Sequence, residues 1–186
     1  MPDETHWQLL PPYLQPDIRF QMALLVAARE IYDRHFARDP MANPTLGFHI
    51  HGYRRSARWR ILLLITPWML SRLLFPEQPP RMPIPRGWSP KQRKEADYQM
   101  LGPAVELRWR GEKLKAHLNY HPCLGHYLLQ PIALNMQHYA TPEEAIRAWS
   151  DVIKVRDTNM QRMQRDCAWQ REISRREFLV GMRDKK

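Results

Sequence analysis

Hydrophobic residues follow two different periods along this chain, and the first period is helical. Residues 16–38 carry apolar side chains three or four positions apart, with Pro16 near the first turn and Asp17 at the positive end of the helix dipole. Two pairs in which proline follows Asp or Asn, at residues 39–40 and 43–44, then break the helix. The predicted buried face contains Ile18, Met22, Leu25, Ala28, Tyr32 and Phe36.

Strand-like runs follow on either side of a short polar connection. Residues 46–53 alternate apolar side chains with polar or small ones, residues 54–57 supply a turn, and residues 58–65 form a second run. This arrangement predicts an antiparallel hairpin. The second run has lost its alternation, so we expect that strand to be central or covered on both faces.

The apolar stretch over residues 62–76 is the most distinctive part of the sequence. Its strand ends at Thr66 and Pro67, because proline has no amide hydrogen for a sheet ladder and favours an extended residue before it. Proline also suits the first turn of a helix, and Thr66 can serve as the N-cap. We therefore predict a short helix over residues 68–75 that Pro76 ends. This segment is too apolar for a surface connection, so another surface must cover it.

The rest of the chain predicts a loop, three strands and a helix. Residues 76–94 are rich in proline and basic side chains and predict a long loop without packed elements. A second hairpin pairs residues 104–110 with 113–120, and a further strand over residues 126–134 carries Pro131, which favours a sheet edge. A helix begins at Thr141, where proline and two glutamates follow the N-cap, and continues to about residue 178.

These elements predict a single α+β domain. We expect a largely antiparallel sheet of about four to five strands, an N-terminal helix, a short helix after the Thr-Pro-Trp turn and a long C-terminal helix. We expect the helices to pack against one face of the sheet. Residues 1–15 form an N-terminal arm, residues 16–156 form the domain, with the basic loop 76–94 inside it, and residues 157–186 form a basic C-terminal helix or tail.

Composition and charge narrow the class of protein. A hydrophobic fraction of 44%, with 7 Trp and 10 Met, is typical of a folded chain. A net charge of +10 favours polyanions or acidic protein surfaces as partners. The 2 cysteines form no CxxC pair, which fits a reducing cytoplasm, and we expect neither a signal peptide nor a membrane span.

The sequence gives little support for catalytic or metal-binding residues. His49 and His51 would share a strand face, but no third and fourth ligands follow at a recognisable spacing. Cys123 lies between His121 and His126 and is interpreted as a small packing residue. The sequence contains no glycine-rich phosphate loop, no GxSxG motif and no carboxylate pair in an apolar context. We therefore predict no enzyme, no metal and no cofactor.

The stretch after the second strand carries a family resemblance. Ile65-Thr-Pro-Trp-Met-Leu-Ser71, followed by Leu74-Phe-Pro76, resembles the signature of the HybE/HupJ family of [NiFe]-hydrogenase assembly chaperones. The resemblance implies a non-enzymatic cytoplasmic chaperone whose partners are the hydrogenase small-subunit precursor and the large subunit. Such a chaperone delays export or assembly until cofactors are installed. The implied partner-binding residues are Thr66, Pro67, Trp68, Met69, Leu70, Ser71, Leu74 and Phe75.

The C-terminal tail gives a second hypothesis. Residues 174–179 read Ser-Arg-Arg-Glu-Phe-Leu, which has the form of a twin-arginine export motif but lies at the wrong end of the chain to direct export. The bland interpretation is a solvated basic tail. The sharper one is that the tail mimics the client and occupies the chaperone's own groove. Its mimicking residues would be Arg175, Arg176, Phe178 and Leu179.

A nucleic-acid-binding protein is the alternative class. The net charge of +10 and the arginine-rich strands with Trp59 and Trp109 could serve phosphate binding and base stacking. No RNP, KH or helix-turn-helix pattern supports this alternative, and the charges are spread along the chain. The assembly chaperone is therefore the favoured interpretation.

Overall fold

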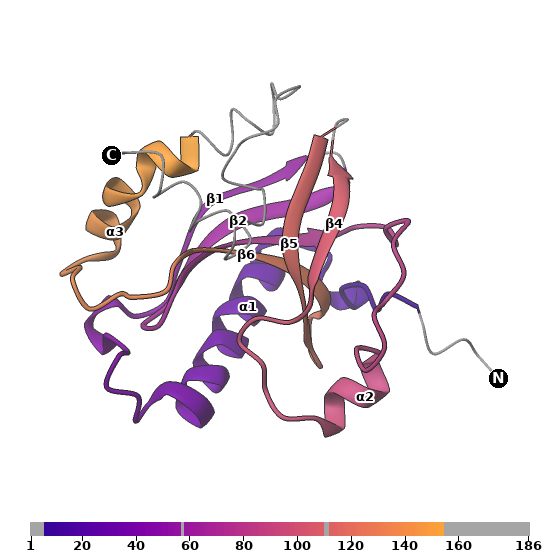
Figure 1. Cartoon of the computed structure of the whole chain (residues 1–186), viewed down its shortest axis with the longest axis horizontal. Coiled ribbons are helices and arrows are strands. Elements are labelled where there is room, and N and C mark those ends of the chain that lie inside the picture. Colours follow the sequence, from indigo (N-terminus) through magenta and orange to yellow (C-terminus); the bar gives the residue numbers. More distant parts are fainter. Residues whose placement is uncertain (1–5, 57, 110–111, 155–186) are drawn as a thin grey trace, which may run out of the picture.

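One six-stranded antiparallel sheet organises the molecule (Figure 1). The computed structural model describes residues 6–56, 58–109 and 112–154. The strand order is β1-β2-β3-β6-β5-β4, so β1 and β4 are the edges and β3 and β6 lie at the centre. The strands are β1 (His49–Ser56), β2 (Trp59–Ile65), β3 (Leu70–Pro76), β4 (Ala104–Trp109), β5 (Glu112–His121) and β6 (Gly125–Ala133).

Helices lie on both faces of this sheet, not on one face as the sequence had indicated. The long helix α1 (Asp17–Ile31), which continues as the π-helical turn η2 (Tyr32–Phe36), crosses one face (Figure 1). There Leu62 and Leu64 of β2 share a core with Leu24. The alternate residues Leu63 and Ile65 share another core with α3 (Pro142–Ala148) on the opposite face. The physical reason is that β2 is buried along its whole length and needs cover on both sides.

The predicted short helix over residues 68–75 is wrong, because this segment is strand β3. Thr66 and Pro67 begin a tight turn that joins β2 to β3, and Ile65 pairs with Leu70 at its base. Proline pre-sets the same backbone angle for a β-turn as for a first helical turn, and here the neighbouring strands decide the outcome. Because residues 70–76 add a strand, the sheet has six strands instead of four to five.

Two further expectations, on the strand over residues 126–134 and on the loop over residues 76–94, are wrong in part. The strand over residues 126–134 is present as β6, but it is central, and Pro131 is accommodated where the register with β3 shifts. The loop 76–94 is not free of packed structure, since Ile84 and Trp88 are buried. It also leads into the short helix α2 (Pro90–Glu95), which starts with a capping box between Ser89 and Gln92.

The buried face of α1 differs from the predicted one. Phe20, Leu24, Ala27 and Ala28 are its buried residues. Ile18 and Met22 were predicted to be buried, but they are 67% and 62% exposed and form an outer stripe with Val26, which is 58% exposed. The helix is therefore apolar on two sides, and periodicity alone could not show which side faces the sheet.

Polar contacts fix the start of α1 on the sheet. The Asp17 carboxylate accepts hydrogen bonds from the Tyr53 hydroxyl (2.7 Å) and from the Arg55 guanidinium (2.5 Å). The hydrogen bond from Tyr53 and the charge of Arg55 hold the pKa of this carboxyl below its usual value. Arg60, which is fully buried, lies 3.5 Å from both Asp17 and Glu77. These contacts tie the helix to β1 and β2.

The described part of the N-terminal segment packs against the sheet as a strap, with Trp7 in one core cluster and Leu10 and Leu14 in another. Trp7, Leu10 and Leu14 are buried, and Trp7 Nε1 donates a hydrogen bond to the Met82 carbonyl (2.8 Å). The strap also uses His126, whose backbone N–H donates to the Gln8 carbonyl (2.8 Å). The predicted C-terminal helix begins as expected at Pro142, but α3 ends at Ala148, and a further helical stretch covers residues 150–154. The rest of the predicted long helix and the tail over 157–186 lie outside the described residues.

Candidate partner-binding pocket

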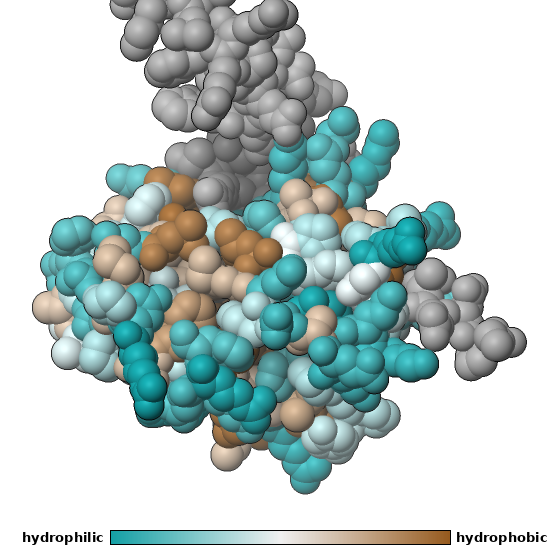
Figure 2. Space-filling view, turned by 60° about the horizontal axis from the view of Figure 1, so that its bottom comes forward, coloured by the Kyte–Doolittle hydropathy of each residue, from teal (hydrophilic) through white to brown (hydrophobic). Residues whose placement is uncertain are grey.

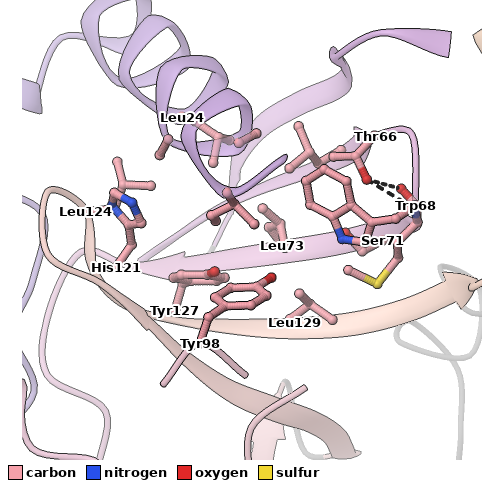
Figure 3. Close-up of a pocket in the computed structure, with 15 residues that line it drawn as sticks. Leu24, Thr66, Trp68, Ser71, Leu73, Tyr98, His121, Leu124, Tyr127 and Leu129 are labelled. Atoms are coloured by element: carbon pink, nitrogen blue, oxygen red, sulfur yellow. Dashed lines mark hydrogen bonds between the residues drawn. The ribbon is translucent and has the colours of Figure 1, made fainter. Parts of the chain in front are cut away.

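An apolar pocket lies between α1 and the sheet, beside the turn that joins β2 to β3 (Figure 3). Its enclosed volume is about 30 Å³, and about 430 Å³ when the space that opens to solvent is included. Figure 2 shows hydrophobic side chains gathered left of the centre of one face, with hydrophilic ones around them and over most of the right side. The pocket is lined by Leu24, Ala27, Ala28, Ile31, Leu64, Thr66, Trp68, Met69, Ser71, Leu73, Tyr98, His121, Leu124, Tyr127 and Leu129.

Hydrogen bonds hold the turn beside the pocket in one conformation. The Thr66 hydroxyl donates to the Met69 carbonyl (2.9 Å) and accepts from the Met69 N–H (3.1 Å). The Thr66 N–H donates to the same carbonyl (3.0 Å), and the Asn43 N–H donates to the Pro67 carbonyl (2.8 Å). All of these bonds are made by buried or half-buried groups, so the turn presents Trp68 and Met69 in fixed positions.

Aromatic rings surround the Trp68 side chain. The π-helical turn after α1 places Phe36 against it, with ring centroids 4.4 Å apart and ring planes 5° apart. Tyr32 stacks at 6.3 Å, and Phe48 approaches edge-on at 6.3 Å. The indole Nε1 is buried and has no hydrogen-bond partner in the described part of the chain. The ring is thus held firmly while its one donor remains unused.

The polar residues of the pocket are uncharged at neutral pH. Burial raises the pKa of Tyr127 to about 12 and also raises the pKa of Tyr98. Burial lowers the pKa of His121 below its ordinary value, so its ring is neutral. None of the lining residues is Asp, Glu, Lys or Arg. The pocket can therefore hold an apolar, uncharged group, and it offers hydroxyl and N–H groups rather than ionic partners.

The residues implied by the family resemblance separate into two groups. Thr66, Trp68, Met69 and Ser71 line the pocket, and Pro67 is buried in the turn beside them. The other three are core residues: Leu70 packs with the α3 side of the sheet, Leu74 packs in a cluster with Trp59, and Phe75 is stacked on Tyr127. Arg175, Arg176, Phe178 and Leu179 lie outside the described residues.

Several pocket residues were missed by sequence reasoning. Tyr98, His121 and Tyr127 reach the pocket from three segments that are distant from Trp68 in the chain (Figure 3). No local pattern marks them, because only the sheet order brings them together. The adjacent small residues Ala27 and Ala28 were a usable signal, since small side chains on a buried helix face leave room beside the sheet.

The candidate residues His49 and His51 are exposed, and Cys123, which was expected to be a packing residue, is exposed as well. Two other histidines make structural hydrogen bonds. His126 is buried and accepts a hydrogen bond from the Gln8 N–H (2.9 Å), and its Nε2 lies 2.9 Å from the Trp88 carbonyl. His117 Nδ1 lies 2.7 Å from the Gly102 carbonyl. Within residues 6–154, apart from the gaps, no three His, Cys, Asp or Glu side chains lie together as a metal site would require. Over the same residues, no helix is long and apolar enough to cross a membrane.

Comparison with known proteins adds a family match. A family model described as "[NiFe]-hydrogenase assembly, chaperone, HybE" matches residues 20–181. Among solved structures, the solution structure of HybE from Escherichia coli is similar, with 16% sequence identity, a TM-score of 0.46, and coverage of 80% of this chain and 83% of that chain. No curated protein matches significantly.

Proposed function

This chain belongs to the HybE family of [NiFe]-hydrogenase assembly chaperones, and from this premise we propose that it binds an immature hydrogenase subunit and delays its export or assembly until the cofactors are installed. The client would be the small-subunit precursor, with the large subunit as a second client. The chaperone would act in the cytoplasm and without catalysis, by covering an apolar signal segment or assembly surface. The observation that carries this proposal is the uncharged pocket beside Trp68.

The chemistry of the pocket favours the apolar part of the client. A twin-arginine signal joins a basic motif to an apolar segment, and the chain itself carries a net charge of +10. Like charges repel, so the arginines of the signal gain little from such a surface. Burial of apolar side chains against Trp68, Met69 and α1 is then the main source of affinity. Thr66 and Pro67 would hold the turn in shape, and Ser71 of β3 would line the pocket beside it. Leu70, Leu74 and Phe75 would support the turn from the core.

A titration of the purified chain with the small-subunit precursor tests this proposal. Isothermal titration calorimetry should detect binding of the precursor and no binding of the same precursor without its signal segment. Burial of apolar surface should also give a negative heat-capacity change. Equal binding with and without the signal segment would show that the chaperone contacts the folded surface of the subunit instead. Absence of binding to either hydrogenase subunit would overturn the proposal.

We also propose that the tail regulates this surface. The segment with Arg175, Arg176, Phe178 and Leu179 resembles the client's motif and would compete for the same pocket. Deletion of residues 171–186 should then tighten binding of a signal peptide, because an intramolecular competitor is removed. Addition of the free tail peptide to the shortened chain should restore the weaker binding. Unchanged or weaker affinity after the deletion would end this idea.

The alternative of nucleic-acid binding loses one of its two tryptophans, and the side chain of the other, Trp109, lies outside the described part of the chain. Trp59 is buried, so its ring is not available for stacking on a base. Arg60 is also fully buried beside acidic side chains. A titration against DNA and RNA in rising salt distinguishes the classes, since binding only at low salt indicates nonspecific charge attraction.

A further inference from the structure

The unused indole N–H of Trp68 distinguishes this tryptophan from two others in the structure. Trp7 Nε1 donates to the Met82 carbonyl, and Trp149 Nε1 donates to the Tyr139 hydroxyl, each at 2.8 Å. Trp68 is only 6% exposed, yet its Nε1 has no partner in the described part of the chain. Buried polar groups are almost always hydrogen-bonded, so an orphan donor at a pocket indicates a partner that arrives with a ligand.

The surroundings of this donor restrict the ligand. Figure 3 shows the nitrogen edge of the Trp68 indole turned into the pocket, on the side of Ser71 and Leu129. Aliphatic side chains of α1 and β3 form the walls, and the lining contains no charged residue. A carboxylate or ammonium group would lose its hydration there without gaining an ionic partner. The fitting ligand is therefore apolar and carries one uncharged hydrogen-bond acceptor.

We infer that the pocket receives a single leucine-, methionine- or phenylalanine-sized side chain of a client polypeptide, with a backbone carbonyl of that segment accepting a hydrogen bond from Trp68 Nε1. This inference rests on the proposed function, because a chaperone's client is a polypeptide. A backbone carbonyl is the uncharged acceptor that every peptide segment carries. The uncharged lining selects the apolar part of a signal segment over the arginines beside it, and Trp68 is the residue that would position that segment through its N–H.

Two substitutions test separately the hydrogen bond from Trp68 and the empty volume of the pocket. Trp68→Phe removes the N–H and keeps an aromatic ring against Phe36, whereas Ala27→Leu fills the pocket with apolar atoms. We expect Trp68→Phe to weaken binding of the synthetic small-subunit signal peptide about 5-fold, the equivalent of one ordinary hydrogen bond. We expect Ala27→Leu to weaken it at least about 10-fold, because the side chain and the peptide compete for one volume.

Matched controls are available in the same fold. Trp149→Phe removes an indole N–H that already has a partner, and Ala23→Leu enlarges α1 at a position that does not line the pocket. Both controls should bind the peptide like the wild type. Thermal unfolding of all four variants identifies any loss of affinity that comes from misfolding. If a folded Trp68→Phe variant and a folded Ala27→Leu variant bind as tightly as the controls, the inference is overturned while the proposed function stands.

A minimal probe makes the test independent of the client. N-acetyl-leucine N-methylamide has a side chain and carbonyl groups of the required kind, and a fragment of this size binds with a dissociation constant on the order of 1 mM. In nuclear magnetic resonance spectra of the full chain, it should shift the indole N–H signal of Trp68 saturably and leave that of Trp149 unchanged. N-acetyl-lysine N-methylamide should shift neither. If the precursor fails to bind but the leucine probe shifts the Trp68 signal, the proposed function is refuted and the inferred ligand of the pocket is retained. If the leucine probe does not shift the Trp68 signal, the inference about the pocket is refuted.

Discussion

The rings of Trp68 and Phe36 lie almost parallel, with their centroids 4.4 Å apart and their planes 5° apart. Phe36 belongs to the π-helical turn that follows α1, and Trp68 belongs to the turn between β2 and β3. This pair therefore joins the end of the helix to the sheet beside the pocket, which Trp68 lines. π-Helical turns often occur at functional sites, and here the turn brings Phe36 onto the indole.

The stack between these rings should be measurable in stability. Phe36→Ala removes a half-buried ring, and we expect the free energy of unfolding to fall by about 2 kcal/mol, less than the loss for a fully buried phenylalanine. Phe36→Leu keeps most of the apolar contact and should cost about half as much. Urea unfolding of the three proteins checks this order. A Phe36→Ala protein as stable as the wild type would show that the stack does not hold the helix end.

The Thr66 hydroxyl should contribute to the free energy of unfolding more than its size suggests. It is buried and makes two hydrogen bonds to the Met69 backbone, so Thr66→Val should lower the free energy of unfolding by about 2 kcal/mol. Thr66→Ser keeps the hydroxyl and should lose less than about 1 kcal/mol. Equal stability of the valine and wild-type proteins in a denaturant titration would refute the role given to these bonds.

Two positions on α1 test which side of the helix faces the sheet. Met22 is 62% exposed, so Met22→Lys should change the free energy of unfolding by less than about 0.5 kcal/mol. Leu24 is 3% exposed, and Leu24→Lys should prevent stable folding because the ammonium group would be buried without a partner. Circular dichroism during heating distinguishes the two variants. The reverse order would support the face that the sequence pattern had indicated.

His126 should make stability depend on pH. Burial lowers its pKa below the value of 6.5 that the unfolded chain has, and its Nδ1 accepts a hydrogen bond that a proton would block. The unfolded chain thus binds the proton more readily. The contribution of His126 is complete above pH 6.5 and is lost as the pH falls toward its lower folded pKa, with a slope of up to about 1.4 kcal/mol per pH unit.

The pH dependence is assigned by substitution. His126→Gln retains an acceptor and a donor without a titrating group, so its stability should fall less between pH 7.5 and about pH 5.5 than that of the wild type. His121, whose pKa is also lowered by burial, contributes in the same direction and should account for part of the remaining slope. Identical pH profiles for the wild type and His126→Gln would remove His126 from the explanation.

Local signals predicted part of the fold well. The helix start at residue 141 is confirmed, since the Thr141 hydroxyl accepts from the Glu144 N–H (3.1 Å) and proline follows the cap. The pairings of β1 with β2 and of β4 with β5 are also confirmed, although residues 54–56, which were expected in the first turn, belong to β1. In each case the residues that decide the structure are neighbours in sequence. The pattern Ser89-x-x-Gln92 is likewise a helix-start signature, so α2 was predictable although the prolines obscured it.

Long-range contacts decided the features that the sequence did not reveal. Thr66 and Pro67 suit a helix start and a tight turn equally well, and the pairing of β3 with β2 on one side and with the distant strand β6 on the other settles the choice. The pocket depends on the same pairing, because β6 carries Tyr127 and its preceding turn carries Leu124. The family signature therefore identified the correct stretch around Trp68, while its secondary structure and its pocket neighbours required the complete sheet.

Site-specific crosslinking tests the central claim most directly, that an immature hydrogenase subunit docks at the pocket beside Trp68. Benzoylphenylalanine is placed at Ile31, a partly buried residue that lines the pocket, or at Leu107 of the edge strand β4, which does not. With the small-subunit precursor present, irradiation should yield an adduct from position 31 to the apolar part of the signal segment, and none from position 107. An adduct from position 107 alone, or none from either position while the precursor is bound, would contradict the account.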